Sequence, residues 1–111
     1  MKIVNKKQFY KLPANTVYSR YKSCMLGDLE IKGNTIGRYE FMNCRITNAV
    51  DMSDPELDKF DILVAAEDDG VSFGMDFARE YPERLFEEDE LFAVWEKDDV
   101  VNLIARLSKC L

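Results

Sequence analysis

The sequence predicts a single α+β domain over residues 1–111, built on a bent, mostly antiparallel sheet or partial barrel of about five strands with two to three helices. A chain of 111 residues, 47% of them hydrophobic, has the size of one domain with one core. Strand-like segments follow one another in runs instead of alternating strictly with helices, which favours the α+β class. A change of face within residues 38–46 predicts a bulge, and bulges bend sheets.

The N-terminal segment is predicted to form a short helix over residues 5–12. Asn5 suits the N-cap position, and Val4 and Phe9 have the spacing of a hydrophobic staple. Pro13 ends this helix, because the residue before a proline disfavours helical geometry.

Three strand-like segments follow, over residues 16–24, 29–32 and 38–46. The first is rich in threonine, valine and tyrosine, and the second alternates strictly, as expected for strands with one buried face. A turn is expected at Gly33. In the third segment the apolar residues change parity after Phe41, which is the predicted bulge.

The second half of the chain contains a helix and two further strands. The Ser-Asp-Pro-Glu sequence at residues 53–56 combines a capping box with a proline in the first turn, so a helix is predicted to begin there and to end near Gly70. Residues 71–77 alternate and predict a strand, residues 78–89 predict a surface connection, and residues 91–95 predict a central strand that is covered on both sides.

A C-terminal helix is predicted to begin with Asp98 as its cap. Its apolar residues have the spacing of one helical stripe, and we expect this stripe to face the core. The stripe consists of Val100, Leu103, Ile104 and Leu107.

Charge is sorted along the chain. Residues 1–50 carry nine lysines and arginines against three aspartates and glutamates, whereas residues 51–111 carry six against eighteen. The resulting charges of +6 and −12 give the net charge of −6. Since net charge acts on steering and association more than on fold, this asymmetry bears on the partners of the protein.

The chain contains no histidine, which excludes several classes of enzyme. Ser-His-Asp and Cys-His catalysis, zinc hydrolysis by His-Glu-x-x-His, and the zinc deaminases all need an imidazole. The glycines form neither a Gly-x-Gly-x-x-Gly turn nor a phosphate-binding loop. Cys24, Cys44 and Cys110 are expected to be core residues, not disulfides or zinc ligands. We therefore expect no enzymatic activity, no cofactor and no metal site.

Three stretches of the chain resemble a group of short, uncharacterised proteins encoded by tailed bacteriophages. They are FYKLPANTVYSRY at residues 9–21, GDLEIKG at residues 27–33 and DELFAVWE at residues 89–96. The resemblance covers about half of the chain. It implies a phage accessory protein, a class that includes host-takeover factors and inhibitors of bacterial defence such as anti-CRISPR proteins. It assigns no residue a role.

Clusters of carboxylates in the second half are the candidate partner-binding residues. They can form a negative face that docks on a basic protein surface, including one that grips nucleic acid, because a basic channel responds mainly to charge and spacing. The alternative is that each cluster is a solvated surface that aids solubility. The candidates are Glu67, Asp68, Asp69, Glu80, Glu83, Glu87, Glu88, Asp89 and Glu90.

The basic first half interleaves tyrosines with lysines and arginines, a composition that can bind RNA on a sheet. The alternative is that these cations pair with the acidic half inside the molecule. The acidic pI of about 4.7 favours the alternative, and direct nucleic-acid binding is not expected.

From the sequence we expect a non-enzymatic, acidic, phage-encoded binding protein that inhibits a basic host protein or complex, for example a defence or nucleic-acid-binding complex such as CRISPR-Cas. One alternative is a small-molecule-binding protein with a pocket in the curved sheet, lined by Tyr18, Tyr39, Phe41 and Trp95. Another is an enzyme in which two acids have pKa values driven apart. Without an apolar run of about 18–20 residues or a signal-peptide hydrophobic region, we expect a cytoplasmic location and no membrane partner.

Overall fold

The protein is described by a computed structural model that covers residues 1–85 and 87–111. Within these residues the strands are β1 (Lys2–Asn5), β2 (Thr16–Lys22), β3 (Met25–Leu26), β4 (Glu30–Gly37), β5 (Glu40–Arg45), β6 (Tyr81–Arg84) and β7 (Leu91–Val94). The helices are α1 (Lys6–Tyr10), α2 (Lys59–Asp69) and α3 (Lys97–Ser108), with a 3-10 turn, η1, at Ile46–Asn48.

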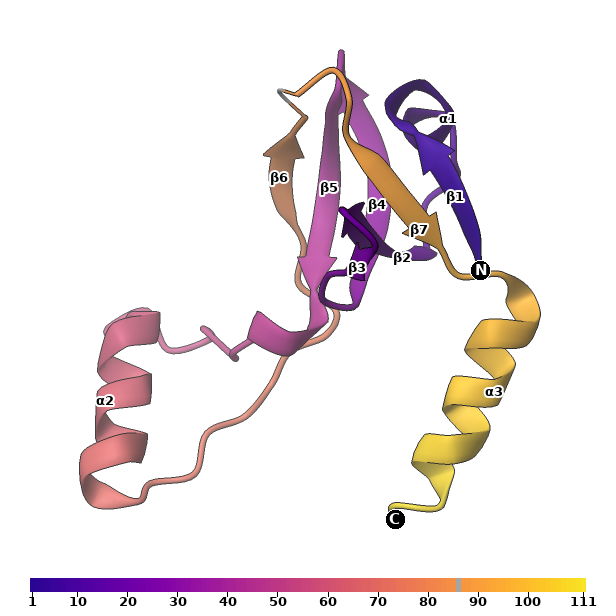
Figure 1. Ribbon diagram of the computed structural model, residues 1–111. Coiled ribbons are helices and arrows are strands. Elements are labelled where there is room, and N and C mark those ends of the chain that lie inside the picture. Colours follow the sequence, from indigo (N-terminus) through magenta and orange to yellow (C-terminus); the bar gives the residue numbers. More distant parts are fainter. Residues whose placement is uncertain (86) are drawn as a thin grey trace.

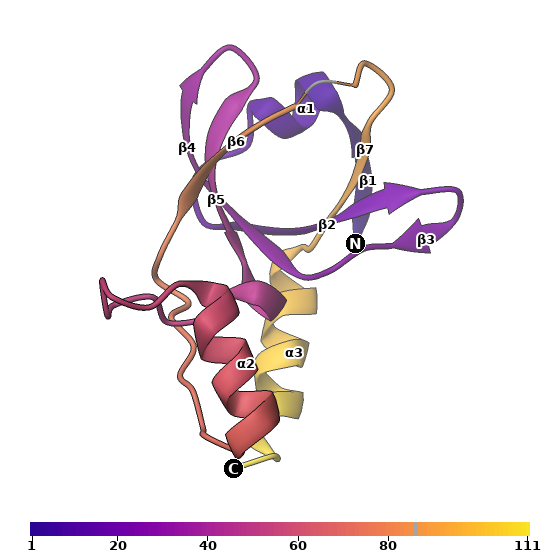
Figure 2. The ribbon, with the colours of Figure 1, turned by 90° about the vertical axis from the view of Figure 1, so that its left-hand side faces the viewer.

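The strands form one antiparallel sheet in the order β1-β7-β2-β4-β5-β6, with β3 paired to β2. The sheet curves around its core (Figure 2) but does not close, because its edge strands β1 and β6 are not paired with each other in the part of the chain that the structure describes. The predicted α+β class and bent antiparallel sheet are confirmed, with seven strands in place of about five.

The N-terminal helix α1 forms as predicted, and a capping box closes its N-terminus. The side chain of Asn5 accepts a hydrogen bond from the backbone N–H of Gln8 at 2.9 Å, and the Gln8 side chain accepts one from the Asn5 N–H at 2.9 Å. Strand β1, which precedes α1 and pairs with β7, was missing from the sequence-based prediction. It has only four residues, and the last of them, Asn5, is the N-cap of α1, so the sequence shows no separate strand pattern there.

Helix α1 carries Phe9 into the centre of the core. The Phe9 ring stacks on Phe92 at 4.0 Å between centroids and meets the edges of Tyr18 at 4.7 Å and Phe41 at 5.4 Å. None of these four rings has solvent-exposed surface, and Val4 and other buried apolar residues complete the cluster. The inside of the curved sheet is therefore filled by side chains.

The prediction of a turn at Gly33 is wrong, because β4 continues through this residue to Gly37. The turn comes later, at residues 38–39, where Tyr39 adopts a left-handed φ of 61°. Gly33 instead lets the carboxylate of Glu80 lie against the strand, since a Cβ there would sit 2.6 Å from a Glu80 oxygen. The register shifts between β4 and β5 occur beside Thr35, so the bulge expected within residues 38–46 lies in β4.

Helix α2 begins at a different cap from the one predicted. Asp58 and Asp61 form its capping box, with the Asp61 N–H donating to Asp58 Oδ1 at 2.8 Å. The predicted start at residues 53–56 is a turn instead, because Asp54 Oδ1 accepts from the Glu56 N–H at 3.0 Å. The end of the helix at Gly70, with a φ of 69°, is as predicted.

Two predictions between α2 and β7 are wrong. Residues 71–77 form no continuous strand: only Met75 makes an isolated bridge, to Val50. Residues 78–89, predicted as a surface connection, contain the edge strand β6, which pairs with β5. An edge strand tolerates Pro82, whose missing N–H faces away from the neighbouring strand.

The C-terminal part follows the predictions more closely. Strand β7 lies between β1 and β2, as expected for a central strand. Helix α3 starts with Glu96 as its N-cap, two residues before the predicted Asp98, and Asp99 Oδ2 accepts the Glu96 N–H at 2.9 Å. The N-terminal ammonium of Met1 donates to the same Asp99 carboxylate at 2.6 Å and ties the first turn of α3 to β1.

Helices α2 and α3 extend away from the sheet on the same side (Figure 1). We name these two projections the legs: one consists of α2 and residues 70–77, and the other consists of α3. Neither contains a buried residue. The stripe on α3 was expected to face the core, and this is wrong, since Ile104 is 59% exposed and Leu107 is 56% exposed. No helix of residues 1–85 and 87–111 is long and apolar enough to cross a bilayer.

Candidate functional site

Arg20 lies at the centre of a cluster of ion pairs on the sheet. Its guanidinium reaches Glu30 at 3.2 Å and Glu90 at 3.3 Å, and it also pairs with Glu83. Arg45 binds the other oxygen of Glu83 at 2.7 Å. Cations of the basic first half thus pair with carboxylates of the acidic second half, which is the second of the two interpretations given above for the tyrosine-rich basic segment.

The carboxylate of Glu30 is buried but well satisfied. It accepts hydrogen bonds from Asn43 Nδ2 at 2.8 Å and from the Tyr18 hydroxyl at 3.3 Å, in addition to Arg20. Burial and the neighbouring Glu30 charge raise the pKa of Tyr18 above its ordinary range, so this hydroxyl stays protonated and remains a donor. The network therefore links β2, β4 and β5 through polar contacts.

Two carboxylates beside Arg20 are shifted in opposite directions. Burial raises the pKa of Glu83, but hydrogen bonds from Arg45 and the charge of Arg20 more than reverse this effect and leave it lowered. Burial raises the pKa of Glu90, and Arg20 offsets only part of the shift. Glu83 lines a cavity, but Glu90 does not line the same cavity. Both carboxylates pair with Arg20, so the three side chains form an ion-pair network.

The nine candidate partner-binding carboxylates fall into three groups. Glu83 and Glu90 form ion pairs with Arg20, and Glu80 lies against Gly33. Two exposed groups remain, which we name the α2 acidic cluster and the β6–β7 acidic cluster. They consist of Glu67, Asp68 and Asp69, and of Glu87, Glu88 and Asp89, respectively.

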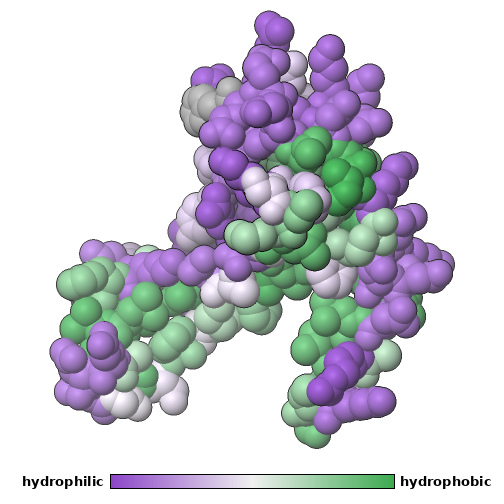
Figure 3. All heavy atoms as spheres, in the orientation of Figure 1, coloured by the Kyte–Doolittle hydropathy of each residue, from purple (hydrophilic) through white to green (hydrophobic). Residues whose placement is uncertain are grey.

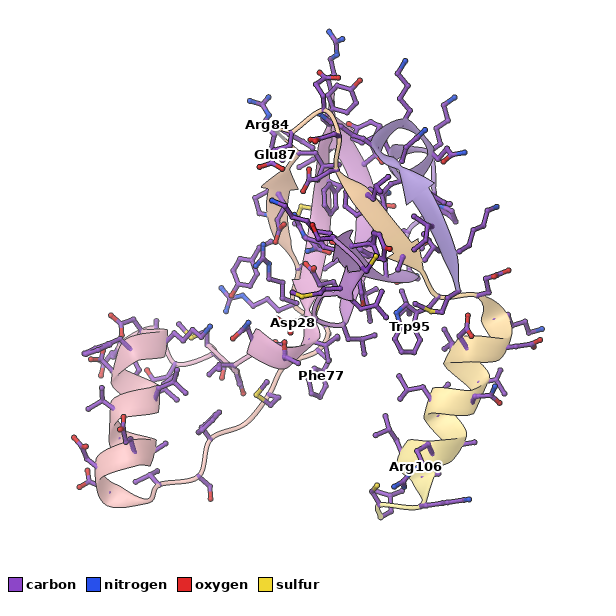
Figure 4. The ribbon with its side chains drawn as sticks, viewed as in Figure 1. Asp28, Phe77, Arg84, Glu87, Trp95 and Arg106 are labelled. Atoms are coloured by element: carbon purple, nitrogen blue, oxygen red, sulfur yellow. The ribbon has the colours of Figure 1, made fainter. Side chains whose placement is uncertain are left out.

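The two acidic clusters lie at opposite ends of a molecule that is 44 Å long. The α2 acidic cluster is at the end of α2 that points away from the sheet (Figure 1), whereas Glu87 lies at the far end of the sheet beside Arg84 (Figure 4). The structure therefore does not bring the nine candidates onto one face. Each exposed cluster has to be considered on its own.

The α2 acidic cluster is unfavourable for the helix that carries it. It occupies the last turn of α2, where the helix dipole already places negative partial charge, and α2 has no basic residue in that turn. Each carboxylate there costs about 0.3–1 kcal/mol of helix stability. Among the described residues no lysine or arginine forms an ion pair with these three carboxylates.

The second feature of the legs is exposed apolar surface. On the α2 side it includes Phe60, which is 73% exposed, and Phe77, which is 54% exposed. On the α3 side it includes Ile104 and Leu107. Apolar side chains cover both legs on the sides that face the open space between them (Figure 3). Patches of this kind mark interaction sites in soluble proteins.

The aromatic residues proposed for a ligand pocket do not form one. Tyr18 and Phe41 belong to the closed core, and Tyr39 packs against Tyr10 with ring centroids 5.4 Å apart. Trp95 is at the base of α3, where its indole N–H donates to Ser19 Oγ at 3.3 Å. One cavity of about 380 Å³ lies between β5, η1 and residues 76–83, outside the aromatic core, and another of about 600 Å³ is lined by Trp95 but by none of the other three residues.

The expectation for the cysteines holds only for Cys44. Cys44 is buried, and its thiol contacts the carbonyl oxygen of Phe77 at 3.4 Å. Cys24, in the turn after β2, and Cys110, after α3, are exposed. In the part of the chain that the structure describes, no three cysteine, aspartate or glutamate side chains converge as metal ligands.

Comparisons with protein-family models, with curated proteins and with solved structures give no significant match. The resemblance to short proteins of tailed bacteriophages therefore stays a prediction.

Sequence reasoning found the acidic residues but missed the exposed apolar surface on the legs. The signal was available in the helical stripe of α3 and in the apolar residues of α2. Periodicity shows that a face is apolar, but it does not show what covers that face. Alternation has the same limit in residues 71–77, because it does not show whether a partner strand is present.

Proposed function

We propose that the protein is a non-enzymatic binding protein whose α2 acidic cluster docks on a basic surface of a partner protein. The observation that carries this proposal is the position of three exposed carboxylates at the end of a projecting helix, where they oppose the helix dipole. A cation from a partner would relieve this repulsion. The cluster therefore suits intermolecular contact better than it suits the stability of the helix.

The partner that fits this cluster is a protein with a basic, exposed groove. Surfaces that bind nucleic acid have this character, and closely spaced carboxylates compete with phosphates for their lysines and arginines. The resemblance to phage proteins supplies a setting for the proposal. In that setting the partner is a host protein in the bacterial cytoplasm, for example a defence complex such as CRISPR-Cas, and binding inhibits it.

The proposal is tested by capturing partners from a bacterial host lysate with the tagged full chain, at low and at high salt. We expect a basic protein to be retained at low salt and released at high salt, because exposed charge pairs are screened. The variant Glu67→Gln/Asp68→Asn/Asp69→Asn is expected to lose this partner. The matched control, Glu87→Gln/Glu88→Gln/Asp89→Asn, removes the same number of charges from the other end of the molecule and is expected to keep it.

Two results would contradict the proposal. Retention that does not depend on salt would show that the contact is not electrostatic. Loss of the partner in the β6–β7 variant, with retention in the α2 variant, would assign the contact to the other acidic cluster. Circular dichroism of both variants controls for folding.

A further inference from the structure

The chain exposes more surface than a compact monomer of its size. Its solvent-accessible surface is 8035 Å², whereas a folded monomer of 12.9 kDa exposes about 6,300 Å². Its radius of gyration is 15.9 Å, against about 13 Å for a compact domain of this length. The excess surface is about 1,700 Å² per chain.

The excess is explained by the legs. Neither α2 nor α3 buries a residue, and the exposed apolar side chains on them and on residues 71–77 include Phe60, Val71, Phe73, Phe77, Val101, Ile104 and Leu107. Apolar surface lies on both sides of the open space between the legs, which can be seen through in Figure 3. The core of the sheet is complete without them.

Helices of this length need support from packing. Isolated helices shorter than about 12–15 residues are marginal in water. Helix α2 has 11 residues and α3 has 12, and α2 also carries the unfavourable acidic cluster. Burial of their apolar faces against another surface would supply the stabilisation that these two helices lack.

We propose that a second copy of this chain supplies this cover, in a two-fold symmetric dimer in which the apolar stripes of the two α3 helices pack against each other between the legs. Burial of the excess surface on both copies would remove about 3,400 Å² from water, which falls in the range of about 2,000–5,000 Å² that obligate homodimers bury. A large and mainly apolar interface of this size is typical of permanent dimers.

The proposed dimer does not depend on the proposed function. It uses the apolar sides of the legs, whereas docking on a basic protein uses the α2 acidic cluster. A dimer would present this cluster twice, which would raise the avidity for a partner with two basic sites.

Sedimentation equilibrium of the full chain over a concentration series tests the dimer. We expect the mass of two chains for the wild type and of one chain for Ile104→Asp/Leu107→Asp, whose dimer should be at least about 100-fold weaker. Both positions are exposed in a single copy, so circular dichroism should show that the sheet of this variant is intact. The control Ile36→Asp changes a residue of similar exposure, 52%, on β4, and it should remain a dimer.

The outcomes separate the alternatives. A wild type that stays monomeric at every concentration overturns the dimer, and the legs would then close on each other or bind a different protein. A dimer that persists in Ile104→Asp/Leu107→Asp places the interface elsewhere.

Discussion

At the scale of single residues, the sheet depends on how its buried charges are paired. Arg20 contacts three carboxylates from distant parts of the chain, and these contacts connect β2 with β4, with β6 and with the segment before β7. Glu83 and Glu90 share this arginine but differ in their other partners. Glu83 also binds Arg45, whereas one oxygen of Glu90 is buried without a hydrogen bond among the described residues.

Substitution of these two carboxylates is expected to have opposite effects. Glu83→Gln should lower the free energy of unfolding at pH 7 by about 1–3 kcal/mol, because it leaves Arg20 and Arg45 without their shared partner. Glu90→Gln should leave it unchanged or slightly raised, because it removes a charge whose burial is only partly offset. Urea unfolding of both variants and the wild type measures the difference.

The pH dependence follows from the signs of the two pKa shifts. The pKa of Glu83 is lowered by folding, so its stabilising contribution is present above the ordinary value of 4.5 and is lost as the pH falls below it. The difference between wild type and Glu83→Gln should therefore shrink in acid. The pKa of Glu90 is raised, so the ionised Glu90 disfavours folding at pH 7 and this penalty disappears in acid. An equal and pH-independent loss in both variants would contradict the assignment.

At the scale of elements, helix starts depend on which of several competing caps is used. Ser53, Asp54 and Asp58 can all cap a helix, and only Asp58 does so. Asp54 is engaged in a turn with Glu56, which moves the start of α2 by several residues. Local sequence therefore predicts that a helix begins in this region, whereas the turn decides where.

The cap of α2 gives a direct test of this assignment. Asp58→Ala should destabilise α2 by about 1 kcal/mol, because the N–H of Asp61 loses its acceptor. Ser53→Ala, at the predicted but unused cap, should have no effect on α2. Amide hydrogen exchange of α2 is the suitable measurement, since this helix can open without the sheet. Faster exchange in Ser53→Ala, with none in Asp58→Ala, would contradict the observed cap.

Elements whose signal is local were predicted well, and elements that depend on distant partners were not. The capping box of α1, the end of α2 at Gly70 and the apolar strand β7 follow from a few adjacent residues. Strands β1 and β6 exist because β7 and β5 lie beside them, which no local pattern reveals. Residues 71–77 alternate like a strand but find no partner strand except at Met75.

The candidate site shows the same division. Sequence alone identified all nine carboxylates as candidates, but it could not show that Glu83 and Glu90 form ion pairs with Arg20, because Arg20 is more than 60 positions from each of them. It also could not show that the two exposed clusters lie at opposite ends of the molecule. Both facts depend on how the sheet is assembled, and they restrict the electrostatic proposal to one cluster at a time.

At the scale of the whole molecule, the protein consists of a curved sheet with its own complete core and of two helices, α2 and α3, that lie outside this core. The sheet encloses Phe9 and the rings around it. Helix α1 lies at the open side of the curved sheet (Figure 2). The legs add surface instead of burying it. Both proposals depend on this division, because the apolar sides of the helices suit a second copy and the acidic end of α2 suits a basic protein.

Amide hydrogen exchange of the wild-type chain across a dilution series tests this division most directly. The account predicts that amides in β2 and β7 keep the same protection at every concentration, whereas amides in α3 lose protection as the dimer dissociates, because a helix of 12 residues is marginal without cover. Protection of α3 that stays constant on dilution of a monomeric chain would show that the helix is covered within one copy, and it would contradict the account.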